Sequence, residues 1–296
     1  MQYYQPQTLI YHDGKFVSAS ATQIDLFGQS LHYGFAAFEG IRAYQTDNGT
    51  RIFKAKEHYL RLQKSCELVG LPYPYDTQDL INASYELLQV NKLKDAYIRP
   101  LVYADANMTL IAPQESKLMI AAWEWGAYLG NKQIKVGISP FQRPNPKSTF
   151  IEAKISGHYV NSILATTHAK RHGYDEALLL DANGFVAEAP GANIFMEKDG
   201  KLFTPALGNI LPGITRSTIM DIAHRLDIPV FEAAITPAEL KAADAAFFCG
   251  TAVEIIGIHT IDDHVFKARW ADTLGATIAS AYKNLVLEKE NFEVII

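Results

Sequence analysis

The chain has 296 residues, of which 48% are hydrophobic and 20% charged, and its formal net charge is −5. This length suits one large domain or two ordinary ones, and the composition excludes a disordered chain. Because there is no basic excess, nucleic acid and anionic membrane surfaces are not expected as partners.

The two cysteines, Cys66 and Cys249, are far apart in the sequence and each has apolar neighbours. Two distant cysteines are too few for a disulfide framework or a cysteine zinc site, and they favour a reduced compartment. The first residues lack the basic and apolar regions of a secretory signal, and no apolar run approaches the ~18 residues of a membrane span. We therefore expect a soluble cytoplasmic protein.

Turn dipeptides that tolerate positive φ angles separate several pairs of short β-prone runs. In chain order they are Asp13-Gly14, Asn48-Gly49, Asn183-Gly184 and Asp199-Gly200. Such dipeptides are typical of tight hairpin turns, so they predict antiparallel sheet.

Helical patterns lie between and after these hairpins, at about residues 56–70, 159–172, 215–227, 236–244 and 271–285. The first has an apolar stripe at spacings of three and four, formed by Tyr59, Leu62, Cys66 and Val69. The fourth begins with Thr236 as N-cap, Pro237 at the first position and Glu239 three residues after the cap.

Hairpins and helices are mixed without a regular βαβ rhythm, which predicts an α+β fold with mainly antiparallel sheets and packed helices. Two glycines and several polar residues between two strand-like runs indicate a domain boundary. We expect a small N-terminal domain at residues 1–125, a loop at 126–134 and a larger C-terminal domain at 135–296.

The segment LPGITR, residues 211–216, delivers a Pro-Gly turn into a helix. The first N–H groups of that helix, near Ile214 and Thr215, have no intrahelical partner and suit an anion, phosphate above all. The alternative is an ordinary turn with Thr215 as N-cap.

Lys154 has apolar neighbours, so it is either an edge-strand lysine with its amine in water or a buried amine able to form an imine. Arg61 and Arg99 could each form a surface salt bridge or bind an anion. His168 and His172 have the i, i+4 spacing of a metal-binding face, but a histidine in the last turn of a helix is common for other reasons. None of these features decides the function alone.

In combination, eight motifs resemble one family. They are LHYGFAAFEGIRAY, KEHYLRL, YIRPL, WGAYLG, EAKISGHYVNS, EAPGANIF, LPGITR and CGTAVE, within about residues 9–285. Their order and spacing are similar to those of branched-chain amino acid aminotransferases, which are two-domain pyridoxal-phosphate enzymes of fold type IV, the fold of D-amino acid aminotransferase.

This resemblance implies that Lys154 forms the Schiff base with pyridoxal 5′-phosphate and then moves a proton between the substrate Cα and the cofactor C4′. Tyr159 matches the tyrosine that hydrogen-bonds the phenolate oxygen. Glu188 matches the glutamate that pairs with the pyridine nitrogen, and the small residues 189–192 after it would leave room for the ring. The family often has an acidic residue at the position of Ala192.

By the same resemblance, the phosphate would lie on the backbone of Ile214 and Thr215, against Arg61 and the hydroxyl of Thr251, with Leu211 under the ring. The N–H groups of Thr251 and Ala252, with Tyr97, match those that hold the substrate α-carboxylate. The expected apolar side-chain pocket consists of Tyr33, Phe38, Tyr128 and Tyr159. Arg99 matches the residue that receives the distal carboxylate of glutamate or 2-oxoglutarate.

The implied reaction exchanges an amino group between L-leucine, L-isoleucine or L-valine and 2-oxoglutarate, giving the branched-chain 2-oxo acid and glutamate. The implied assembly is a homodimer or a higher homo-oligomer in which a loop, for which residues 107–111 are the candidate, closes the neighbouring site. The cysteine spacing does not match the redox pair of the vertebrate members. No metal is implied.

Three alternatives remain open at this stage. A D-amino acid transaminase or an aminodeoxychorismate lyase shares the lysine, the glutamate and the phosphate site. A catalytically silent binding protein could retain the fold. A metal-assisted hydrolase would use His168 and His172.

Overall fold

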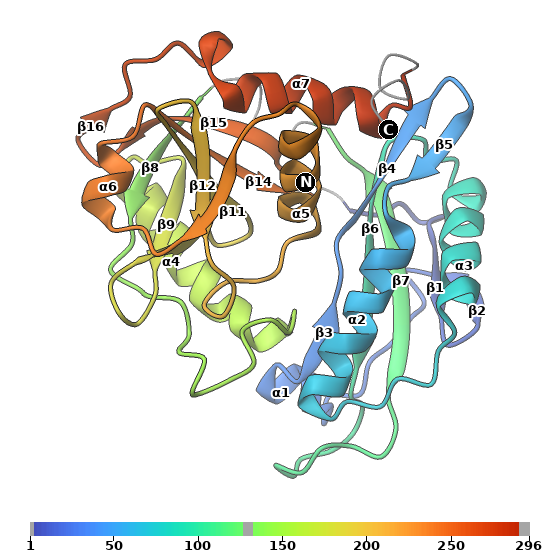
Figure 1. The fold of residues 1–296 in the computed structure, drawn as a ribbon. Helices are drawn as coiled ribbons and strands as arrows, with labels where there is room; N and C mark the ends of the chain where they lie inside the picture. The colour runs from blue at the N-terminus through green and yellow to red at the C-terminus, as the bar shows by residue number, and fades with distance from the viewer. Residues whose placement is uncertain (1–2, 127–132, 290–296) are drawn as a thin grey trace. The chain divides into compact units, whose positions relative to one another are not determined.

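The computed structural model describes residues 3–126 and 133–289, and the chain forms two compact units (Figure 1). The first unit comprises Met1–Gly126 and Ala153–His158, and the second comprises Ala127–Glu152 and Tyr159–Ile296. Residues 153–158, which contain Lys154, thus group with the first unit although they follow the loop expected at 126–134.

In the described residues, the first unit contains a seven-stranded antiparallel sheet of order β2-β1-β7-β6-β4-β5, with β3 paired to β6. Its strands are β1 Leu9–His12, β2 Lys15–Ser18, β3 Ala36–Phe38, β4 Ile41–Thr46, β5 Gly49–Ile52, β6 Ala96–Tyr103 and β7 Lys117–Glu124. Its helical elements are α1 Gln29–Tyr33, α2 Ala55–Val69, α3 Thr77–Val90 and the 3-10 turn η1 Ser156–His158.

Helices α2 and α3 supply the core that covers one face of this sheet. The stripe predicted on α2 is confirmed: Tyr59, Leu62 and Cys66 are fully buried, and Val69 packs against the same cluster. Burial raises the pKa of the Cys66 thiol to about 12. Because side chains alternate along a strand, the residues of β6 that do not face the helices are presented on the other face of the sheet.

The second unit contains a nine-stranded mixed sheet, in the described residues, of order β10-β9-β8-β15-β14-β11-β12-β13, with β16 paired to β15. Its strands are β8 Ile134–Ile138, β9 Glu176–Leu180, β10 Val186–Glu188, β11 Asn193–Lys198, β12 Lys201–Pro205, β13 Val230–Ala233, β14 Ala245–Gly250, β15 Glu254–Ile261 and β16 His264–Val265. Its helical elements are α4 Tyr159–Arg171, α5 Ile214–Arg225, α6 Pro237–Lys241, the 3-10 turn η2 Trp270–Asp272 and α7 Leu274–Val286.

Parallel pairing joins β8 to β9 and to β15, and β12 to β13, while the other pairs of this sheet are antiparallel. The α+β class with mainly antiparallel sheets is therefore confirmed. The capping box predicted at Thr236 is present, with reciprocal bonds between Thr236 and Glu239.

Antiparallel strand pairs flank all four predicted turns, but only two of the four dipeptides form the turn as predicted. Asn183 and Gly184 lie in the longer loop between Leu180 and Val186, and Gly184 alone of the two has a positive φ. Asp13-Gly14 and Asp199-Gly200 are the two-residue turns of β1–β2 and β11–β12, with positive φ at all four residues. Thr46 pairs with Gly49, so the turn of β4–β5 is 47–48 and the prediction of Asn48-Gly49 as the turn is wrong by one residue. Gly49 instead begins β5 with a φ of 101°.

Helix α3 was not among the predicted elements. Its sequence signal is Asp76, whose carboxylate accepts from the amides of Gln78 and Asp79 as an N-cap. None of the helices in the described ranges has the length and apolar character needed to cross a membrane.

Candidate active site

Helix α2 carries a polar face beside its buried apolar stripe. His58, Arg61 and Ser65 recur at spacings of three and four, which places them on one side of the helix. Because the apolar stripe fixes the rotation of α2 against the sheet, this polar face has a set direction in the first unit.

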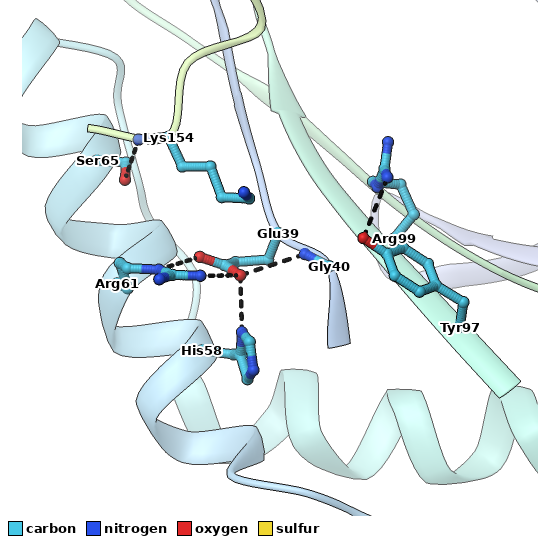
Figure 2. A network of polar contacts seen from close by, with 8 residues as sticks. All are labelled: Glu39, Gly40, His58, Arg61, Ser65, Tyr97, Arg99 and Lys154. Atoms are coloured by element: carbon cyan, nitrogen blue, oxygen red, sulfur yellow. Dashed lines mark hydrogen bonds and ion pairs between the residues drawn. The ribbon is translucent and has the colours of Figure 1, made fainter. Parts of the chain in front are cut away.

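The polar face of α2 contacts Glu39, which lies between β3 and β4 (Figure 2). Arg61 donates from Nε to Oε1 at 2.6 Å and from Nη2 to Oε2 at 2.8 Å. His58 donates from Nδ1 to Oε2 at 2.7 Å, and the Gly40 amide donates to the same oxygen at 3.2 Å. The carboxylate has no exposed surface, whereas the Arg61 side chain retains 13% exposure.

The charges of this network are set by the pair of Glu39 and Arg61. Burial acts to raise the pKa of Glu39, but the charge of Arg61 and the bonds from His58 and Arg61 hold that pKa well below its usual range. Burial lowers the pKa of His58, against the opposing effect of Glu39. His58 is therefore a neutral imidazole at pH 7, and because it faces an ionised carboxylate we assign its proton to Nδ1.

Lys154 is held through its backbone to two elements of the first unit. Its N–H donates to Ser65 Oγ at 3.0 Å, and its carbonyl accepts from the Phe38 amide at 3.1 Å. Its Nζ lies 5.0 Å from the centre of the Phe38 ring, and its charge helps to lower the pKa of His58. Lys154 belongs to no strand, so the edge-strand alternative is wrong.

Arg99 lies on an aromatic surface on the face of the sheet away from the helices. Its Cζ is 4.7 Å from the ring centre of Phe38, 5.3 Å from that of Tyr97 and 5.9 Å from that of Trp123. Its Nη2 donates to the Tyr97 hydroxyl at 3.3 Å (Figure 2). Its Nε is buried without a hydrogen-bond partner, and it has no carboxylate as an ion-pair partner, within the described ranges. The surface-salt-bridge alternative does not describe Arg99.

In the second unit, Glu188 ends β10 and is buried. Its Oε1 accepts from the Leu211 amide at 3.0 Å, and its Oε2 accepts from Asn193 Nδ2 at 2.9 Å. The amide of Ala189 donates to the carbonyl of Ala192 at 2.8 Å, so the small residues form a tight turn directly after the carboxylate. Asn193 also donates to the Leu211 carbonyl at 3.0 Å, which joins the two segments.

Arg143 is a further partner of Glu188. Its Nε lies 2.9 Å from Oε1, with both side chains almost fully buried, but the angle does not make a hydrogen bond. The contact is thus an ion pair. Local sequence does not mark Arg143, Asn193, Glu39 or His58 as site residues, because the partners of all four are fixed only by the fold.

Helix α5 begins at Ile214, where LPGITR predicted a helix start. Its N-cap is Gly213, no side chain caps it, and the prediction of Thr215 as an alternative N-cap is wrong. Thr215 is buried in the first turn. An N-terminus without a side-chain cap presents backbone N–H groups and the positive end of the helix dipole.

Thr251 and Ala252 lie in the turn between β14 and β15, where Gly250 pairs with Glu254. Tyr159 begins α4, and Ser162 one turn later donates to the Pro190 carbonyl at 2.8 Å. This bond ties α4 to the turn after Glu188 within the second unit.

The remaining predicted residues have other settings. Tyr33 is 46% exposed and donates to the Met108 carbonyl at 3.4 Å, so it is not a core aromatic. Gln29 Nε2 donates to the carbonyls of Thr109 and Ile111, which ties the loop at 107–111 to α1. Tyr128 lies outside the described residues.

His168 and His172 stack with ring centres 4.1 Å apart, and His172 Nδ1 lies 2.8 Å from the His168 carbonyl. Among the described residues, no group of three or more histidine, cysteine or acidic side chains is placed to hold a metal ion. His168 lies in the last turn of α4, and His172 directly follows the end of the helix.

The first unit therefore brings together Phe38, Arg61, Tyr97, Arg99 and Lys154 of the predicted site residues. The second unit contains Tyr159, Glu188, Leu211, Ile214, Thr215, Thr251 and Ala252.

The chain is similar to known proteins over most of its length. Residues 36–261 match the family described as amino-transferase class IV. The branched-chain-amino-acid aminotransferase of Pseudomonas aeruginosa is 38% identical over 287 residues, covering 95% of this chain and 94% of the relative, and that of Escherichia coli K12 is 37% identical, covering 86% and 84%.

Among solved structures, the branched-chain aminotransferase of Thermoproteus uzoniensis with norvaline has a TM-score of 0.92 at 38% identity, covering 96% of this chain and 97% of the other. A T.th. branched-chain amino acid aminotransferase complexed with N-(5′-phosphopyridoxyl)-L-glutamate also has a TM-score of 0.92, at 34% identity, covering 97% of both chains. The chain belongs to the class IV amino-transferase family.

Proposed function

We propose that the protein is a pyridoxal-phosphate transaminase that exchanges the amino group between L-leucine, L-isoleucine or L-valine and 2-oxoglutarate. The observation that carries the substrate assignment is Arg99 on the aromatic surface of Phe38, Tyr97 and Trp123. The relatives named above support it, since they are named for the branched-chain amino acids.

This surface suits both halves of the reaction. The aromatic rings accept an apolar branched side chain, and the guanidinium, which no carboxylate of the described ranges neutralises, attracts the distal carboxylate of 2-oxoglutarate. Tyr97 serves both roles because its ring is apolar and its hydroxyl accepts from Arg99.

The residues of each unit fit pyridoxal phosphate. In the second unit, the start of α5 offers N–H groups of Ile214 and Thr215 to a phosphate, and the Thr251 hydroxyl and Leu211 would complete its surroundings. In the first unit, Arg61 would add a guanidinium. Glu188, buried and ionically paired, would face the pyridine nitrogen, and Tyr159 would donate to the phenolate oxygen.

When bound, the cofactor would supply an electron sink that makes the substrate Cα proton acidic. Lys154 would hold the cofactor through its amine. Once the substrate amine has displaced it, the freed Nζ would accept that proton, and the Lys154 backbone is fixed for this by Ser65 and Phe38. The N–H groups of Thr251 and Ala252, with the Tyr97 hydroxyl, would orient the substrate α-carboxylate. In the first unit, Phe38 and Tyr33 are the proposed apolar residues for the substrate side chain, and in the second unit Tyr159 is the proposed one.

We also propose that the protein acts in the cytoplasm as a homodimer or a higher homo-oligomer. Large apolar side chains are exposed around α1 and the loop at 107–111: Leu26, Phe27, Leu31, Leu110 and Ile111. A surface of this kind typically marks a protein interface. Light scattering should give at least twice the chain mass, and a monomer at micromolar concentration would contradict the assembly.

The absorption spectrum of the purified protein between about 300 and 500 nm tests the cofactor and the substrate together. A visible band that fades when leucine is added supports the proposal. A band that ignores leucine and responds to D-alanine favours the D-amino acid relative, and no band after incubation with pyridoxal phosphate overturns the proposal.

A further inference from the structure

The buried carboxylate of Glu39 fixes the plane of the Arg61 guanidinium. Two parallel bonds, of 2.6 Å and 2.8 Å, form a bidentate fork that holds one edge of the group. Such a fork adds geometric specificity as well as energy. Because a guanidinium is planar and rigid, fixing one edge also sets the direction of the opposite edge.

The exposure of the pair is unequal. Glu39 has no exposed surface, and Arg61 keeps 13%. Of the two side chains, the one that a ligand can reach is therefore that of Arg61. Arg61 comes from helix α2, and Glu39 comes from the short link between β3 and β4, where its amide donates to the Pro100 carbonyl at 3.0 Å. Both side chains thus start from backbone held by regular structure or a hydrogen bond.

His58 completes this arrangement without adding charge. Its Nδ1–H occupies Oε2 at 2.7 Å, and the Gly40 amide donates to the same oxygen. With Glu39 ionised and His58 neutral, the charge that Glu39 pairs with in these contacts is that of Arg61. A fully hydrogen-bonded carboxylate cannot swing toward another partner without leaving buried donors unsatisfied.

We infer that Glu39 and His58 are positioning residues that hold the Arg61 guanidinium in the orientation in which it binds the phosphate of the cofactor. This inference rests on the proposed function, because it takes Arg61 as a phosphate ligand. It assigns roles to two residues that touch neither substrate nor cofactor in the proposal.

The test compares two forms of the cofactor on the full chain depleted of pyridoxal phosphate. Pyridoxal phosphate and pyridoxal differ only in the phosphate, so the ratio of their dissociation constants isolates the phosphate contribution. Groups that orient a ligand-binding side chain typically contribute about ten- to a hundredfold to affinity, as measured for metal ligands. We expect Glu39→Gln to raise the dissociation constant of pyridoxal phosphate by about this factor. The dissociation constant of pyridoxal should change by no more than about twofold, the size of ordinary non-additivity.

A double-mutant cycle connects the effect to Arg61. If Glu39 acts through Arg61, Glu39→Gln weakens the binding of pyridoxal phosphate much less in the Arg61→Gln background than in the wild type. His58→Asn, which keeps an N–H donor near the position of Nδ1, should retain more phosphate discrimination than His58→Leu. The two His58 variants also decide the matter if Glu39→Gln does not fold.

Glu176→Gln is the matched control. Glu176 is also a buried carboxylate, but its partners are the Thr166 hydroxyl and the Ala177 amide. This variant should leave the ratio of the two dissociation constants unchanged.

Three results overturn the inference. Equal weakening of pyridoxal and pyridoxal phosphate would reduce Glu39 to a general structural role. Tighter binding of pyridoxal phosphate to Glu39→Gln would mean that Glu39 competes with phosphate for Arg61. A wild-type chain that binds neither compound would overturn the proposed function as well, which separates the two failures.

Discussion

Arg143 and Glu188 form a buried ion pair in the second unit, with Nε 2.9 Å from Oε1. Glu188 also accepts bonds from Asn193 and the Leu211 amide, so its charge is balanced and its oxygens are oriented before any cofactor binds. A buried carboxylate without such partners would neutralise itself by a raised pKa. Arg143 therefore helps Glu188 to remain ionised.

The first prediction concerns the stability of this pair. Arg143→Met keeps much of the apolar stem and removes the charge, which leaves Glu188 buried without its cation. Breaking a buried pair in this way typically costs about 3–5 kcal/mol of unfolding free energy. Denaturant unfolding of the full chain measures it. In the control Arg269→Met, the lost pair with Asp272 is exposed, so its loss should lower the unfolding free energy far less. Equal losses for the two variants would contradict the buried role.

The second prediction concerns acid stability and Glu39. Its folded pKa lies below the ordinary value of about 4, so the unfolded chain takes up a proton there while the folded chain does not. The stabilisation is complete above about pH 4 and is lost as the pH falls below it. The advantage of the wild type over Glu39→Gln should therefore shrink between about pH 5 and pH 2.

The contribution of His58 to stability also declines as the pH falls, but in a higher pH range. Its folded pKa lies below the ordinary value of about 6.5, so its contribution is complete above that pH and declines as the pH falls. The contribution of Glu176 to stability has the opposite pH dependence. Burial raises the pKa of Glu176, so its contribution declines as the pH rises above about 4. Stability curves of Glu39→Gln and Glu176→Gln with the same slope against the wild type would contradict both assignments.

The parts of the fold that follow from local pattern could be predicted from the sequence. The stripe Tyr59, Leu62 and Cys66 fixed the buried side of α2, and Asp13-Gly14 fixed a hairpin register. The start of α5 followed from LPGITR. Each of these signals lies within a few residues of the structure that it determines.

Parts that depend on distant partners could not be predicted. Arg143 pairs with a carboxylate 45 positions later, and nothing in its neighbourhood of the sequence distinguishes it from a surface arginine. Glu39 lies within the motif LHYGFAAFEGIRAY, but its contacts depend on helix α2, which reaches it only in the folded unit. The sequence does not decide whether Lys154 is an edge-strand lysine or a buried amine, because apolar neighbours are compatible with both.

The third prediction tests the proposed dual use of Arg99. Arg99→Ala removes a cation that has no carboxylate partner in the described ranges, so it should affect a substrate with a distal carboxylate most. Hydrogen bonds to charged groups contribute about 1.5–3 kcal/mol, which corresponds to a loss of roughly ten- to a hundredfold in kcat/KM for 2-oxoglutarate. The half-reaction with leucine should change much less.

Single-turnover kinetics separates the two half-reactions of Arg99→Ala, and Arg225→Ala, at an exposed position, is the control. If leucine turnover collapses while 2-oxoglutarate turnover is untouched, Arg99 does not bind the distal carboxylate.

The fourth prediction concerns the approach of Gly213 to Asn193. A Cβ at position 213 would lie 1.9 Å from Asn193 Oδ1, so Gly213→Ala must displace the amide that donates to Glu188 and to the Leu211 carbonyl. Overpacking of this kind costs about 1–3 kcal/mol, and the displaced donor leaves Glu188 with one bond fewer. Gly191→Ala is the matched control, because a Cβ there meets no atom within 4 Å and its φ is not in the left-handed region. Thermal unfolding of the cofactor-free chain measures both variants, so that any contact of Gly191 with a bound cofactor does not enter. We expect a lower midpoint for Gly213→Ala alone. Equal midpoints would mean that Asn193 moves without cost, and its bond to Glu188 would then contribute little to the second unit.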